Sequence, residues 1–305
     1  MLNTRIGSLE LSSPLLTASG TFGHDPSALA FLKPGDLGAL VLKTVTLEPR
    51  HGNPIPRMCE FTGGVMNSIG LENRGLEHFQ QVVAPDFSGL AMPVIGNAGG
   101  HAVDDYVAMV GAMHEMPCIQ AIEVNLSCPN VAGGSLPFAT DPDAIQRVMQ
   151  ACREATDKPL WAKLSPNVTR MAPLALACES SGADAITVGN TVLGLAVDWR
   201  TRKPALGAGF GGMSGPAIRP IAMRMVYEAV QAVNIPVIAC GGAQSADDIL
   251  DFTVVGAAAV QIGTAVFRRP DAFSIIAAEL RQILHQASTT LDELRGSLEW
   301  PGRVS

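Results

Sequence analysis

The sequence predicts an α/β fold, namely a closed (β/α)8 TIM barrel with a parallel eight-stranded core and an excursion above the barrel top. Eight β-rich runs recur along the chain with helix-like stretches between them, and each run is continuously apolar. Strands covered on both faces require this continuity, whereas half-exposed strands alternate. Eight such units suit a closed barrel better than an open doubly wound sheet, which usually has about five or six strands. We expect residues 1–305 to form a single domain, because neither a linker nor a shift in composition divides them.

The expected strands share an apolar body and an end that is polar or rich in glycine. Active sites of such barrels lie at the carboxyl ends of the strands, so the last residues of each run are candidates for function. In chain order the runs span 13–20, 37–44, 93–100, 121–128, 159–166, 184–191, 235–242 and 258–265.

Helices are predicted in several gaps by a capping residue followed by an early proline. Such starts occur in "HDPSALAFL" at 24, "TDPDAIQRVMQ" at 140 and "SGPAIRPIAMRMVYEAV" at 214, and "SADDIL" at 245 adds a capping box. The segment 45–72 is rich in proline and glycine and is too long for an ordinary βα loop, so we expect it to form the excursion. The tail after about 287 is polar and contains no motif.

Composition and charge exclude several classes of protein. The net charge is −7 and the isoelectric point is near 5.4, so there is no basic excess to neutralise nucleic acid. The six cysteines form no CxxC pair, and the six histidines show no HExxH spacing. The start lacks the apolar core of a signal peptide, and no run approaches the ~20 apolar residues that span a bilayer. We therefore expect a cytoplasmic protein that binds neither nucleic acid nor membrane and holds no metal.

Amides, lysines and glycines end the eight runs. Three asparagines offer paired donors and acceptors for the edge of a planar, amide-bearing ring. Two lysines favour an acidic substrate, or a cofactor that becomes anionic on reduction. Glycines after the last two strands suit a phosphate held by backbone N–H groups, although glycine also serves ordinary turns. These strand-end residues are Ser19, Lys43, Thr44, Asn97, Asn125, Lys163, Asn190, Thr191, Gly241, Gly242, Gly263 and Thr264.

Cys128 is the candidate reactive group, because it directly follows the fourth run in "AIEVNLSCPN". Pro129 stops the strand, and a loop with a Gly133-Gly134 hinge follows, so the thiol is expected where substrate binds. A thiol whose thiolate fraction is raised by nearby lysines is a competent general base near neutral pH. The alternative is that Cys128 merely fills the barrel mouth while Asn125 caps a turn.

Two further glycine motifs do not fit the functions they suggest. "GAGFGG" at 207–212 has the spacing of a dinucleotide fingerprint, but it follows the polar loop "DWRTRKPAL" instead of a strand. The acidic residue that would hold the ribose, Glu228, is predicted inside a helix. "GGMSG" at 211–215 lacks the spacing of a hydrolase elbow. We interpret 207–212 as a mobile glycine-rich loop.

Eight motifs spread over residues 43–267 resemble the class 1 dihydroorotate dehydrogenases. They are "KTVTLEPRHGNPIPR", "NSIGLEN", "VNLSCPNV", "KLSPNVT", "GNT", "GMSGPAI", "CGGAQSADDIL" and "IGTAVF". The resemblance implies an FMN-dependent (β/α)8 enzyme of pyrimidine biosynthesis that oxidises dihydroorotate to orotate. Cysteine in the base position is similar to class 1, because class 2 enzymes use serine and have a membrane-associating N-terminal extension.

"NSIGLEN" followed by "RGLEHF" looks more like subclass 1B. That resemblance implies a homodimer of this chain joined to an electron-transfer subunit in a heterotetramer. The partner would hold FAD and a [2Fe–2S] cluster and pass electrons to NAD+. Two positions depart from the subclass pattern: Arg74 stands where proline is frequent, and Gly189 stands where a bulkier residue is common.

The resemblance also implies roles for individual residues. Cys128 would remove a proton from C5 of dihydroorotate while a hydride leaves C6 for the flavin. Substrate would contact Lys43, Asn67, Ser68, Ile69, Gly70, Leu71, Asn125, Asn190 and Thr191. FMN would contact Ser19, Lys43, Thr44, Asn97, Asn125, Lys163, Gly189, Gly215, Gly241, Gly242, Gly263 and Thr264.

Three other functions remain open when the sequence alone is considered. A dihydropyrimidine dehydrogenase-like flavoenzyme shares the "SCP" motif but acts on uracil or thymine, and a subclass 1A enzyme uses fumarate. A flavin-free lyase or aldolase could use Lys163 as a Schiff-base amine. A binding protein without catalysis is disfavoured, because it has no need of a base in a hinged loop.

Overall fold

The computed structural model describes residues 2–127 and 139–301, so Cys128 and the loop after it lie outside the described residues. Eight parallel strands form one sheet in the order β3-β16-β15-β10-β9-β8-β7-β4. The strands are β3 (Leu15–Thr17), β4 (Leu40–Val41), β7 (Val94–Ala98), β8 (Ala121–Asn125), β9 (Leu160–Leu164), β10 (Ala185–Val188), β15 (Val237–Cys240) and β16 (Ala259–Ile262). Each lies inside one predicted run.

The sheet closes on itself between its first and last strands. Leu16 forms a parallel bridge with Ala39, and the backbone N–H of Gly38 donates to the carbonyl of Leu15 at 2.8 Å. A closed ring has no free edge, so the backbone groups of all eight strands find partners. The predicted barrel is therefore confirmed.

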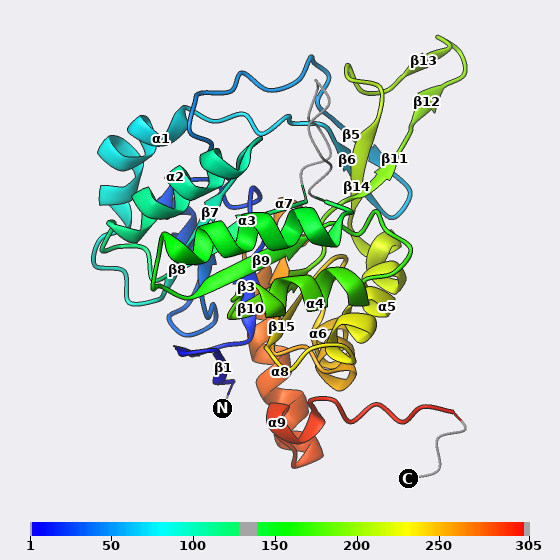
Figure 1. Cartoon of the computed structure of the whole chain (residues 1–305). Coiled ribbons are helices and arrows are strands. Elements are labelled where there is room, and N and C mark those ends of the chain that lie inside the picture. The colour runs from blue at the N-terminus through cyan, green and yellow to red at the C-terminus, as the bar shows by residue number, and fades with distance from the viewer. Residues whose placement is uncertain (1, 128–138, 302–305) are drawn as a thin grey trace.

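Helices surround the ring on its outer side, as Figure 1 shows. They bury apolar stripes against the strands and form the larger of two apolar clusters. The main helices are α2 (Val103–His114), α3 (Pro142–Glu154), α4 (Ala172–Ser180), α5 (Arg219–Val230), α6 (Ala246–Val255) and α8 (Ala272–Ala287). Shorter turns are α1 (Gly75–His78), η2 (Phe79–Val83), η3 (Ala84–Phe87), η4 (Pro216–Ile218), α7 (Ala265–Arg268) and α9 (Leu291–Leu294).

Two of the predicted caps mark the starts of α-helices, whereas the start at 214 opens the 3-10 helix η4 and then α5 without a side-chain cap. Asp141 caps α3, and Ser245 caps α6 in a capping box with Asp248. The start at 24 is capped by Asp25 as expected, but it opens only the 3-10 helix η1 (Pro26–Phe31) instead of an α-helix. Pro34 follows closely and cannot continue a helix.

The excursion at 45–72 forms half of a small antiparallel sheet. Strands β5 (Met58–Phe61) and β6 (Gly64–Asn67) form a hairpin, and β6 pairs with β14 (Gly211–Ser214), which pairs with β11 (Val192–Gly194). Figure 1 shows this sheet beyond one end of the barrel, with the hairpin of β12 (Val197–Asp198) and β13 (Lys203–Pro204) extending from it. "GAGFGG" leads into strand β14 and not into a helix, and Glu228 lies in α5, which agrees with rejecting a dinucleotide fingerprint.

An N-terminal hairpin covers the opposite end of the barrel. Strands β1 (Thr4–Ile6) and β2 (Leu9–Leu11) place Ile6 and Leu11 in a second apolar cluster with Leu16, Trp161 and Ile238. These last three residues come from the barrel strands, so the amino end of the barrel interior is apolar and closed. No helix in the described part of the chain is long and apolar enough to cross a lipid bilayer.

Candidate active site

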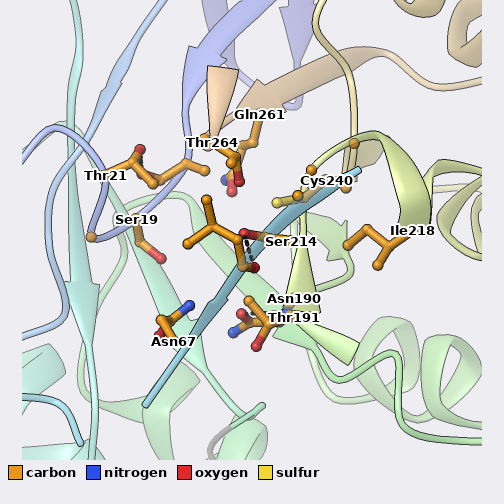
Figure 2. Close-up of a pocket in the computed structure, with 18 of the residues that line it drawn as sticks. Ser19, Thr21, Asn67, Asn190, Thr191, Ser214, Ile218, Cys240, Gln261 and Thr264 are labelled. Carbon is orange, nitrogen blue, oxygen red and sulfur yellow. Dashed lines mark hydrogen bonds between the residues drawn. The ribbon is translucent and has the colours of Figure 1, made fainter. Parts of the chain in front are cut away.

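A cavity of about 310 Å3 lies where the carboxyl ends of the barrel strands meet the small antiparallel sheet. In Figure 2, Asn67, Asn190 and Thr191 lie at one end of the view and Thr21, Gln261 and Thr264 at the other. Most of the predicted residues line this cavity. They are Ser19, Lys43, Thr44, Asn67, Ile69, Leu71, Asn125, Lys163, Asn190, Thr191, Gly215, Gly241, Gly242, Gly263 and Thr264.

Four predicted residues do not line the cavity. The Ser68 hydroxyl accepts a hydrogen bond from Asn53 Nδ2 at 2.7 Å, and Gly70 packs against the same asparagine. Gly189 packs beside Pro166. Asn97 is fully buried in the barrel wall, and its Oδ1 has no hydrogen-bond partner among the described residues. Cys128 lies outside the described residues, so its placement stays a prediction.

A chain of hydrogen bonds joins the amide side chains at the rim. Asn125 donates from Nδ2 to Thr44 Oγ1 at 3.1 Å, and its Oδ1 accepts from the Ser127 hydroxyl at 2.5 Å. Asn190 donates from Nδ2 to the same Ser127 hydroxyl. These residues end strands β4, β8 and β10 or directly follow them, so the chain crosses the barrel mouth. It holds the amides in fixed orientations, as recognition of one planar ligand requires.

Lys43 is a half-buried cation at the rim, and its ammonium makes no hydrogen bond within the described residues. Burial lowers the pKa of Lys43 below its ordinary value, while Glu72 opposes this decrease and Arg57 reinforces it. A desolvated ammonium that faces a cavity without an ion-pair partner is suited to bind a carboxylate.

Lys163 is a second cation, at the floor of the cavity, and it is only 2% exposed. Its ammonium donates to Gln261 Oε1 at 2.8 Å and lies 3.6 Å from Glu123 Oε1. Burial opposes the charged form, whereas Cys240 in its thiolate form and Glu123 favour it, and the balance raises the pKa of Lys163 above its ordinary value. The nearby Glu123 carboxylate therefore favours the ammonium form of Lys163.

Glycines form a cradle where β15 and β16 end. Gly242 has φ of +83°, and a Cβ there would lie 2.7 Å from the Cβ of Arg219. Gly242 also lines the cavity, three residues before the capping residue of α6. Bare backbone beside the N-terminus of a ten-residue helix is suited to bind a phosphate.

Glu123 and Gln261 were missed by reasoning from strand ends. Both are buried in the middle of β8 and β16, where they contact each other and Lys163. The signal was present in the sequence, because a carboxylate inside an apolar run must find partners when it is buried. Ser127, next to the predicted Cys128, was also left out of the predicted contacts.

Residues 1–284 match the family model described as dihydroorotate dehydrogenase. A protein of Trichlorobacter lovleyi named dihydroorotate dehydrogenase B (NAD(+)), catalytic subunit, is 44% identical over 299 residues, which cover 98% of each chain. The protein of the same name from Listeria monocytogenes is 41% identical and covers 96% of this chain and 97% of its own. A crystal structure of DHODH from Eimeria tenella in complex with ferulenol has a similar fold, with a TM-score of 0.81, 21% identity, and coverage of 97% of this chain and 88% of that chain.

Proposed function

The chain belongs to the dihydroorotate dehydrogenase family, and on that premise we propose that it is the catalytic subunit of an enzyme that oxidises dihydroorotate to orotate. The reaction is a step of pyrimidine biosynthesis. One observation supports this proposal most strongly: a single cavity combines an amide rim, two lysines and a glycine cradle. A planar acid fits between the amides and Lys43, while a phosphorylated cofactor fits between Lys163 and the glycines.

Two features of the described residues fit FMN. The cradle at Gly241, Gly242, Gly263 and Thr264 suits its phosphate. Asn97 does not line the cavity, so its contact with FMN stays a prediction that rests on its buried Oδ1, which has no partner among the described residues. Lys163 places a positive charge at the cavity floor, where it stabilises the electron-rich ring. When bound, FMN supplies the acceptor for the hydride that leaves the substrate.

The rim residues would bind and orient the substrate. Lys43 pairs with its carboxylate, and Asn67, Asn125, Asn190 and Thr191 hydrogen-bond to the carboxylate or the ring amides. Of the predicted backbone contacts at 68–71, those of Ile69 and Leu71 line the cavity and would add donors, while the Ser68 N–H already donates to the carbonyl of Arg57 at 2.8 Å. This segment is held by Asn53 and by Asn73, whose Nδ2 donates to the carbonyl of Leu71 at 2.7 Å. Because Thr44 and Ser127 already fix Asn125, little orientation entropy is lost on binding.

Cys128 would be the general base that takes the proton from C5. Its neighbour Ser127 is buried at the cavity rim, so the chain leaves the described region beside the proposed substrate site. A thiolate is a suitable base near neutral pH when cations lie nearby.

Electrons would leave through a partner. The relatives are named catalytic subunits, which supports an additional subunit here, and we infer that it holds FAD and a [2Fe–2S] cluster and reduces NAD+. We further propose a homodimer of this chain within a heterotetramer, located in the cytoplasm.

The test is a spectroscopic titration of the purified chain. We expect a yellow protein with one FMN per chain whose visible flavin band is bleached by dihydroorotate and restored by added oxidants. Bleaching or reoxidation by pyrimidines such as uracil or thymine instead would favour a dihydropyrimidine dehydrogenase-like activity. Efficient reoxidation by fumarate would favour subclass 1A, and a colourless protein that cannot be loaded with FMN would overturn the proposal.

A further inference from the structure

Glu123 lies at the centre of a polar network inside the barrel, and its side chain is fully buried. Its Oε1 accepts from Asn97 Nδ2 at 2.6 Å. Its Oε2 accepts from Thr187 Oγ1 at 2.7 Å and from Gln261 Nε2 at 2.6 Å. These partners come from three other strands, β7, β10 and β16, so the carboxylate is fixed from several directions. An ionised carboxylate is stable at this depth only because it has such partners.

Lys163, on the neighbouring strand β9, lies beside Glu123 in the barrel interior and also reaches the cavity. Its ammonium lies 3.6 Å from Glu123 Oε1 and donates to Ser19 Oγ at 3.2 Å as well as to Gln261. Among the described residues, the titratable groups that face it are Glu123 from β8 and Cys240 from β15, whose sulfur is 4.0 Å away. Burial raises the pKa of the Cys240 thiol, so at neutral pH this sulfur is uncharged. Glu123 is therefore the counter-charge of Lys163.

We propose that Glu123 is a positioning residue that keeps Lys163 charged and directed at the cavity before any anion binds there. An isolated buried ammonium sheds its proton, and fully buried lysines can titrate as low as about pH 5–6. The Glu123 carboxylate offsets the cost of burying the Lys163 charge. The side-chain amide of Gln261 accepts from Lys163 and donates to Glu123, so it holds both groups in place. The inference rests on the proposed function in one respect, namely that reduced FMN is the anion that Lys163 meets.

The charge state of Lys163 in the oxidised protein sets the number of protons taken up when the flavin is reduced. Two electrons and one proton convert the oxidised ring into its singly protonated anion. With Glu123 present, Lys163 is already an ammonium, so reduction takes up this one proton alone. Without the carboxylate, Lys163 is neutral in the oxidised protein and gains a proton when the ring becomes negative. Reduction then takes up two protons for two electrons.

The experiment measures the reduction potential of the bound FMN against pH, from about pH 7.5 to about pH 9, below the ordinary pKa of lysine. Dye equilibration on the FMN-loaded protein should give a slope of one proton per two electrons for the wild type. The Glu123→Gln variant keeps the shape of the side chain and removes its charge, and its slope should double. An unchanged slope in Glu123→Gln would overturn the proposal.

A charge-swap variant is the matched control. In E123Q/Q261E the carboxylate moves to the position that already contacts the Lys163 ammonium at 2.8 Å, and the new amide can donate back to it. This double variant should recover the wild-type slope, which a merely structural role for Glu123 does not predict. If Glu123→Gln does not fold, the double variant decides the matter alone: it must fold with the wild-type slope, and a doubled slope or failure to fold counts against the proposal.

A second measurement needs no flavin. NMR of 15Nζ-labelled lysine separates ammonium from amine, and Lys163→Met identifies the signal. At about pH 8 the FMN-free wild type should show an ammonium at Lys163 and Glu123→Gln should show an amine. If the wild-type chain binds no FMN, the proposed function fails, yet this measurement still decides the role of Glu123. An ammonium in both proteins would show that Glu123 is not needed to keep the charge.

Discussion

Asn125 donates a hydrogen bond to the Thr44 hydroxyl at 3.1 Å, although 81 positions separate the two residues. The contact joins the carboxyl ends of β8 and β4, and both side chains are buried. A strand-end amide is thereby fixed by a second strand end before any ligand arrives. The rim is therefore preorganised for a ligand.

Replacing Asn125 by alanine should impair both stability and turnover. The change leaves the Ser127 and Thr44 hydroxyls without their partner in a buried setting, which costs about 1–3 kcal/mol in the free energy of unfolding. Without the fixed amide, kcat/KM for dihydroorotate should fall by about 10- to 100-fold. Urea denaturation and steady-state kinetics measure the two effects. Thr44→Ser keeps the hydroxyl that accepts from Asn125, so its losses in the free energy of unfolding and in kcat/KM should both be much smaller. Losses equal to those of Asn125→Ala would argue against the role of the Asn125–Thr44 contact.

Cys128→Ala should retain FMN and orotate binding while turnover falls by about 10² to 10⁴, the usual loss when a general base is removed. Orotate binding is read from the shift it causes in the flavin spectrum, and turnover from stopped-flow reduction by dihydroorotate. Cys128→Ser should be slow as well, because an alkoxide is much harder to form near neutral pH than a thiolate. Undiminished reduction in the alanine variant would refute the base assignment.

Gly242→Ala should weaken FMN binding and destabilise the chain. Left-handed backbone costs an alanine about 1–2 kcal/mol, and overpacking against Arg219 adds about 1–3 kcal/mol. Gly209→Ala is the control, because Gly209 has φ of +82° with nothing within 4 Å of the added Cβ. It should show the backbone cost alone and bind FMN as the wild type does. Fluorescence quenching of FMN gives the dissociation constants, and equal effects at both positions would remove the steric argument for the cradle.

Lys43 should make orotate binding sensitive to alkaline pH. Because burial lowers its pKa, the ammonium is lost at a lower pH than for an ordinary lysine. Affinity for the orotate carboxylate should be full below that pKa and decline as pH rises through it. Arginine stays charged throughout this range, so Lys43→Arg should lose this decline even if its overall affinity is lower. Persistence of the same decline in Lys43→Arg would assign it to another group.

The main architecture could be predicted because its signals are local. Each barrel strand is buried on both faces, so it reads as an unbroken apolar run such as "DAITVGNT" or "IPVIACGG". Parallel strands also end at one face, so residues as distant as Ser19 and Thr264 could be assigned to one site without coordinates. The capping residues of α3 and α6 were equally visible, because a cap depends on three or four consecutive residues.

Pairings between distant segments had no such signal. The excursion at 45–72 was expected, but its partners β14 and β11 lie far along the chain, and no local pattern names them. The type of helix at 24 could not be predicted either. The proline after η1 could be read from the sequence, but nothing in the local pattern distinguished a 3-10 helix from an α-helix.

What the sequence determined by itself is the order of strands and helices, and with it the rim of amides, lysines and glycines. The tertiary structure alone decided which residues in the middle of the strands face inward. Glu123, Lys163, Thr187 and Gln261 meet because the stagger of neighbouring strands puts their side chains in the interior at nearly the same height. Stagger is a property of the closed ring as a whole, so no single strand encodes it.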